Sequence, residues 1–153
     1  MSLKDRISDE IKSAMKAKDK IRLETVRGVK KLILEKESEV RATGQDELTE
    51  SQEIAILTQM AKQRRDAIQQ YTDAGRTDLA DKEAQELVIL DEFLPAQLSE
   101  AEIEAVIDEL IAETGASGPR DIGKVMGPAM KRMQGQADGG TVQKLVKAKL
   151  SGS

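Results

Sequence analysis

The sequence predicts an all-α protein of two helical domains, an N-terminal four-helix part over residues 1–94 and a C-terminal three-helix tail over residues 95–153. Three observations support this prediction. Apolar residues recur at helical spacing from end to end, no segment alternates with the two-residue period of a strand, and capping and turn residues separate the apolar stretches. The 34% charged, 39% hydrophobic composition is typical of a soluble globular protein.

Four apolar stripes define the predicted N-terminal helices. The first two hold Leu3, Ile7, Ile11 and Met15, followed by Val26, Val29, Ile33 and Val40. Thr49 and Gln52 form a capping box before the third stripe, which ends at Gly75. The fourth helix is expected from about Asp78 to Phe93, because Pro95 prevents it from continuing far.

The boundary between the domains is expected at the Leu-Pro-Ala-Gln-Leu segment, residues 94–98, which leads into a capping box of Ser99 and Glu102. The helix that follows should stop at Gly115, and Pro119 suits the first turn of the next one. A final helix is expected after the Asp-Gly-Gly turn at residues 138–140.

The middle helix of the tail has a clear apolar face, formed by Ile122, Val125, Met126, Ala129, Met130 and Met133. We interpret its methionines as core residues rather than as an adaptable groove for a partner. Gly123 and Gly127 fall on one edge of this face, where a neighbouring backbone could approach closely. Pro128 lies in mid-helix, so we expect a kink or break near Gly127.

The composition excludes most catalytic chemistry. With no cysteine and no histidine, the chain lacks thiolate zinc ligands and the commonest general base. "GPRDIGKV", residues 118–125, has the spacing of a phosphate loop, but Val125 replaces the hydroxyl residue and no strand precedes it. We therefore expect no catalytic residues, no cofactor and no metal, and we do not expect an enzyme.

The sequence also predicts a cytoplasmic protein with no membrane partner. Its longest apolar run is four residues, Leu87 to Leu90, whereas a membrane span needs about 20. Lys4, Asp5 and Arg6 occupy the N-terminal region, where a signal peptide would have an apolar core.

Charge is unevenly distributed along the chain. Residues 94–115 carry six acids and no base, whereas residues 116–153 carry seven bases and two acids. The candidate nucleic-acid-binding residues are the exposed bases of this last segment, namely Arg120, Lys124, Lys131, Arg132, Lys144 and Lys147. A solvated basic face is the alternative interpretation. Arg64, Arg65 and Arg76 are interpreted as members of surface or interhelical salt bridges.

Three segments carry a resemblance to known families. "DIGKVMGPAMKRMQGQADGGTVQKLVKAKL", residues 121–150, resembles the tail domain of the B subunit of the tRNA-dependent amidotransferase. "QRRDAIQQYTDAGRTDLADKEAQEL" and "EFLPAQLSEAEI", residues 63–87 and 92–103, are similar to the helical domain and the domain junction of the stand-alone YqeY family. The chain departs from the tail pattern at Gln134 and Gln136, where basic residues are common, and at Pro128.

The resemblance implies tRNA, or a protein that handles tRNA, as the partner. In the amidotransferase, the tail is associated with holding tRNA, while a larger catalytic domain performs the carbon–nitrogen ligase reaction with glutamine as amide donor. Ligase activity would reach this chain only by family transfer, and a shared fold does not carry function. Two functions stay open: a tRNA-associated accessory protein, and a helical protein-interaction module that does not bind RNA.

Overall fold

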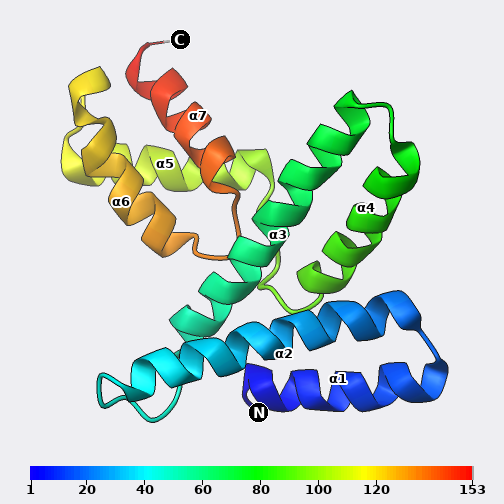
Figure 1. Ribbon diagram of the computed structural model, residues 1–153. Helices are drawn as coiled ribbons and strands as arrows, with labels where there is room; N and C mark the ends of the chain where they lie inside the picture. Colours follow the sequence, from blue (N-terminus) through cyan, green and yellow to red (C-terminus); the bar gives the residue numbers. More distant parts are fainter. Residues whose placement is uncertain (153) are drawn as a thin grey trace. The chain divides into compact units, whose positions relative to one another are not determined.

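The computed structural model describes residues 1–152 and is helical throughout its regular structure (Figure 1). Within this range there are seven α-helices and one short 3-10 helix, and no strand. The predicted all-α class is confirmed. Residue contacts group the chain into two compact units, Met1–Leu94 and Pro95–Ser153.

The first unit consists of two helical hairpins. Its helices are α1 (Leu3–Ala17), α2 (Lys20–Arg41), α3 (Glu50–Asp73) and α4 (Thr77–Asp91). Figure 1 shows α1 beside α2 and α3 beside α4, with each pair joined by a turn. The predicted capping box of Thr49 and Gln52 begins α3, and Gly75 follows that helix with a positive φ of 72°.

The core of the first unit is almost entirely aliphatic. Its fully buried side chains include Ile7, Val26, Val29, Ile33, Leu57 and Leu90. One aromatic residue, Phe93, joins this core, and the Arg6 guanidinium lies 5.2 Å from its ring centre. The apolar stripe of α2 is therefore confirmed as its core face.

Met15 departs from the stripe predicted for α1. Its side chain is 54% exposed, and Ala14 is buried in its place. A spacing of four residues advances about 40° further than one helical turn at each step. After three steps from Leu3, the stripe has rotated by about 120°. Met15 therefore lies away from the face that Leu3 and Ile7 bury.

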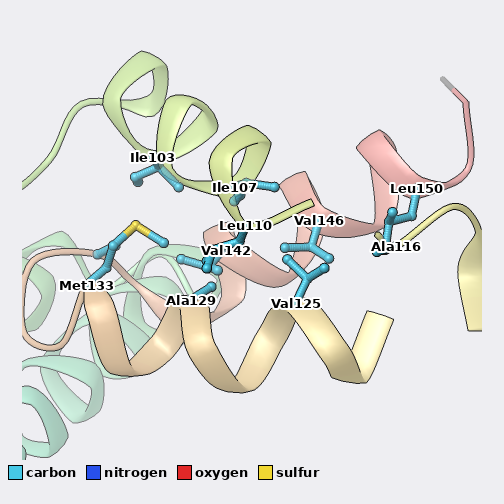
Figure 2. Packing of buried hydrophobic residues seen from close by; sticks show 11 residues of the cluster. Ile103, Ile107, Leu110, Ala116, Val125, Ala129, Met133, Val142, Val146 and Leu150 are labelled. Carbon is cyan, nitrogen blue, oxygen red and sulfur yellow. The ribbon is translucent and has the colours of Figure 1, made fainter. Parts of the chain in front are cut away.

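The second unit packs three α-helices around its own core. These are α5 (Glu100–Thr114), α6 (Ile122–Arg132), which follows the 3-10 helix η1 (Pro119–Asp121), and α7 (Gly139–Leu150). Figure 2 shows Ile107 of α5, Val125 and Ala129 of α6, and Val142 and Val146 of α7 directed toward one another. The capping box of Ser99 and Glu102 and the left-handed Gly115 at the end of α5 are as predicted.

Helix α6 differs from its prediction in three respects. It continues through Pro128 without a break. Pro128 has no N–H, so the Lys124 carbonyl four residues earlier lacks its helical hydrogen bond. Because Lys124 and Pro128 are both exposed, water can solvate this carbonyl. Gly123 and Gly127 face open space, so no neighbouring backbone approaches them. Met133 is buried as expected, but Met130 is 37% exposed.

The segment that precedes α5 is held by the turn between α6 and α7. The Gln97 side-chain amide donates a hydrogen bond to the Gly135 carbonyl at 2.6 Å, and the Leu98 N–H donates to the Gln136 carbonyl at 2.8 Å. The Gln136 side chain in turn donates to the Ala96 carbonyl at 3.3 Å. These bonds fix residues 95–98 to the second unit.

None of the helices among residues 1–152 combines the length and the apolar character that a transmembrane span requires.

We expect fragments 1–94 and 95–153 each to fold alone, because each unit's core is built from its own residues. Circular dichroism of the separate fragments should show helical spectra and cooperative thermal unfolding. A fragment that is unfolded by itself but helical when its partner is added would contradict the division into two domains.

Candidate nucleic-acid interface

Helix α6 places Lys124 and Lys131 on the face opposite its buried residues Val125 and Ala129. Both lysines are exposed. Lys124 Nζ lies 3.3 Å from Asp121 Oδ1, so its charge is partly balanced. The pKa of Asp121 is lowered, first by the hydrogen bond it accepts from the Ser117 N–H and then by Lys124.

Arg132 is directed toward α5 rather than toward these lysines. Its guanidinium contacts Glu109 at 3.0 Å and Glu113 at 3.4 Å. Lys149 of α7 contacts Asp108 at 3.2 Å in a similar way. The acidic surface of α5 therefore holds these two cations, and Arg132 does not share the outer face of α6.

Four candidate residues have no ion pair within residues 1–152, and all four are exposed: Arg120, Lys131, Lys144 and Lys147. Lys144 and Lys147 lie on α7 opposite Val142 and Val146. The buried faces of α6 and α7 meet in one core, so their outer faces point in different directions. The lysines of the basic surface of this unit therefore lie on the outer faces of two different helices, α6 and α7.

The turn around Gly135 is not available as a phosphate loop. Gly135 has a φ of 73° and is buried, and its carbonyl accepts the Gln97 amide. Gln136, which stands where the related tail pattern is often basic, also binds the preceding segment. The polar groups of this turn thus form hydrogen bonds that hold the segment preceding α5.

Arg64 and Arg76 form salt bridges of the kind predicted for them. Arg64 Nε connects α3 to α4 through Glu86 at 3.2 Å and Glu83 at 3.8 Å. Arg76 pairs with Asp78 at 3.1 Å on the exposed turn between these helices. The Arg64 contacts therefore join α3 to α4, whereas the Arg76 pair is local to the start of α4.

A hollow of about 460 Å³ lies beside the start of α1, and two of the carboxylates that line it, those of Glu37 and Glu53, have partners. Glu37 accepts a hydrogen bond from Lys4 Nζ at 3.4 Å through Oε2, and its other oxygen lies 3.1 Å from the same ammonium in a charge contact. Glu53 accepts the Leu3 N–H at 2.9 Å. Across residues 1–152, no cluster of three or more potential ligands is arranged to hold a metal ion.

Comparison with known proteins assigns the chain to a family. The family model described as "Yqey-like protein" matches residues 4–150. The chain belongs to the YqeY-like family. The resemblance of residues 63–87 and 92–103 to that family is therefore confirmed.

The YqeY-like chain is similar to fungal proteins named "Altered inheritance of mitochondria protein 41, mitochondrial". It is 35% identical to the protein from Lachancea thermotolerans over 74% of this chain and 60% of the relative. The identity to the protein from Vanderwaltozyma polyspora is 30%, over 76% of this chain and 64% of the relative. The chain thus spans less than two thirds of the length of these relatives.

The predicted cytoplasmic localisation is wrong, because these relatives carry mitochondrial names, as do those from Kluyveromyces lactis and Pyrenophora tritici-repentis. That prediction came from residues 4–6 and from the absence of a long apolar run. Neither feature distinguishes the cytoplasm from an organelle interior.

The Arg64 cluster gives a pH-dependent prediction. Burial raises the pKa of Glu83, repulsion from Glu86 adds to the rise, and Arg64 opposes it. Ionised Glu83 therefore costs stability above its folded-state pKa, and this cost disappears as the pH falls through that pKa toward the unfolded value. Glu83→Gln should raise the free energy of unfolding at neutral pH by less than about 1 kcal/mol, with a smaller gain in acid.

Glu86→Gln is the contrasting variant, because it removes the closer partner of Arg64. It should lower the free energy of unfolding by about 1–2 kcal/mol at neutral pH. Urea unfolding of both variants at neutral and acidic pH measures these changes. Equal losses for the two variants would show that Glu83 is stabilising and that its burial is not the dominant effect.

Proposed function

We propose that this YqeY-like protein is an accessory protein that associates with tRNA through phosphate contacts from its C-terminal unit. The observation that carries the proposal is the set of exposed cations without acidic partners on η1, α6 and α7: Arg120, Lys131, Lys144 and Lys147. Arg132 and Lys149 pair with acids of α5 and partly neutralise them. The other four cations form no such pair and remain available to contact phosphates.

The surface beside the α6 lysines is suited to a phosphate backbone. Gly123 and Gly127 are exposed, and nothing lies within 4 Å of the position where a side chain would begin. A strand of RNA can therefore approach the helix closely beside Lys124 and Lys131. The resemblance of residues 121–150 to the amidotransferase tail, which is associated with tRNA, supports the same function.

Binding of this kind is electrostatic and largely independent of base sequence. Both aromatic residues, Tyr71 and Phe93, belong to the first unit, so the C-terminal unit has no ring on which a base could stack. Each lysine or arginine that contacts a phosphate releases counterions from the RNA. The affinity should consequently be weak and should fall steeply with salt. Ligase chemistry is not part of the proposal, since a shared tail fold does not transfer catalysis.

The test replaces one lysine on each basic helix, in the variant Lys131→Gln/Lys144→Gln. Mobility-shift titrations of tRNA at low and moderate salt should show weaker binding and a salt slope that is flatter by about two units at most. Lys36→Gln/Lys62→Gln is the matched control, because it makes the same charge change at lysines of the first unit that pair with Glu39 and Asp66.

Two outcomes would overturn the proposal: no mobility shift even at low salt, or identical slopes for the wild type and the Lys131/Lys144 variant. Either result would identify the α6 and α7 lysines as a solvated surface. The protein-interaction module would then be the favoured function.

A further inference from the structure

A second basic surface lies at the turn between α1 and α2, in the other unit of the protein. We define the turn patch as four lysines and two apolar residues around this turn: Lys12, Met15, Lys16, Lys18, Lys20 and Leu23. All four lysines are exposed, and none forms an ion pair within residues 1–152. No part of the function proposed above uses these residues.

The turn is tightly constrained by hydrogen bonds. Lys18 adopts a left-handed conformation with a φ of 55°, and its N–H donates to the carbonyls at the end of α1. The Asp19 N–H donates to the Ala14 carbonyl at 3.0 Å. The Asp19 carboxylate accepts the Arg22 N–H at 3.1 Å and so caps α2. The patch is therefore built around a short turn whose backbone conformation is well defined.

Two of the four lysines, Lys18 and Lys20, line an apolar hollow. Its volume is about 400 Å³, and its walls are formed by Ala14, Met15, Lys18, Asp19, Lys20 and Leu23. Met15 is an apolar residue of the amphipathic helix α1, yet it is 54% exposed. The patch thus combines exposed apolar surface with several cations, and lysine stems can cover such a surface while their ammonium groups stay in water.

Most carboxylates of the same two helices have partners elsewhere. Glu10 binds Arg22 at 2.7 Å, and Glu37 binds Lys4 at 3.1 Å. Glu39 binds Lys36 at 3.2 Å. The Asp19 carboxylate within the hollow caps α2 and keeps its negative charge, but four lysines outnumber it, so the patch has a net positive charge.

We propose that the turn patch binds the surface of an anionic phospholipid membrane. Lysine clusters are attracted to anionic headgroups, and an exposed methionine gains from burial at the boundary between headgroups and acyl chains. An RNA backbone would use the lysines but would leave Met15 and the hollow without a partner. A lipid surface uses both features, which is why it is favoured over RNA.

This proposal departs from the sequence-based expectation of no membrane partner. That expectation concerned spanning segments, which need about 20 apolar residues. A patch that rests on headgroups needs no span. With one methionine and four lysines, binding should be weak, reversible and sensitive to salt.

The experiment is co-sedimentation of the full chain with vesicles. Phosphatidylcholine vesicles should bind little protein, and phosphatidylcholine mixed with phosphatidylglycerol should bind it at low salt and release it at high salt. Lys16→Gln/Lys20→Gln should weaken this binding about 25-fold, since each lysine near an anionic surface contributes about fivefold. Met15→Ser should weaken it about fivefold, because about half of the methionine side chain would be buried.

Two control variants carry the same charge change at other sites. They are Lys36→Gln/Lys62→Gln and Lys131→Gln/Lys144→Gln. Their affinities for anionic vesicles should agree within about twofold, because neither variant changes a residue of the turn patch. Circular dichroism checks that each variant is folded. The Lys131/Lys144 variant also separates this proposal from the RNA proposal, since it should weaken tRNA binding and keep lipid binding.

The proposal is overturned if anionic and neutral vesicles bind the protein equally. It also fails if the Lys16/Lys20 variant binds anionic vesicles as well as the two controls do. A third contrary result is that the Lys16/Lys20 variant loses tRNA binding while no protein binds vesicles, which would assign the turn patch to RNA.

Discussion

Burial of aliphatic side chains on one face of each helix is the constraint on which the rest of this structure depends. Both cores are made chiefly of valine, isoleucine and leucine, and Phe93 is the single aromatic residue among their buried members in residues 1–152. Each such side chain contributes roughly 1.5–3 kcal/mol when fully buried. Because one face of every helix is used in this way, most charged residues lie on the other faces, and Glu37 is the buried exception within residues 1–152.

Whether an exposed cation forms an ion pair depends on the acids that neighbouring helices place beside it. In the second unit, Arg132 and Lys149 lie close enough to α5 to pair with its acids, whereas Lys131 and Lys144 point away from it. In the first unit, Arg22 joins Glu10 and Glu92, while the lysines around the α1–α2 turn form no ion pair within residues 1–152. An overall net charge of −4 thus coexists with local surfaces that are positive.

Features that depend on a few neighbouring residues could be predicted from the sequence. The capping boxes at Thr49 and Ser99 and the helix stop at Gly115 are of this kind, because their hydrogen bonds lie within one turn of chain. Features that depend on distant neighbours could not. Met130 has helical spacing, but only the packing decides that it is partly exposed. The interhelical pairing of Arg132 was missed for the same reason, although the acids of α5 four residues apart, Glu109 and Glu113, were a signal that could have indicated it.

We propose that two basic surfaces, one in each unit, bind two different anionic partners. Flotation of fluorescent tRNA with anionic vesicles, with and without the full-length protein, tests both surfaces in one measurement. The tRNA should float with the vesicles only when the protein is present, because the C-terminal unit holds RNA while the turn patch holds lipid. Displacement of the protein from vesicles by tRNA, with no tRNA in the floating fraction, would contradict it by showing that both partners compete for one surface.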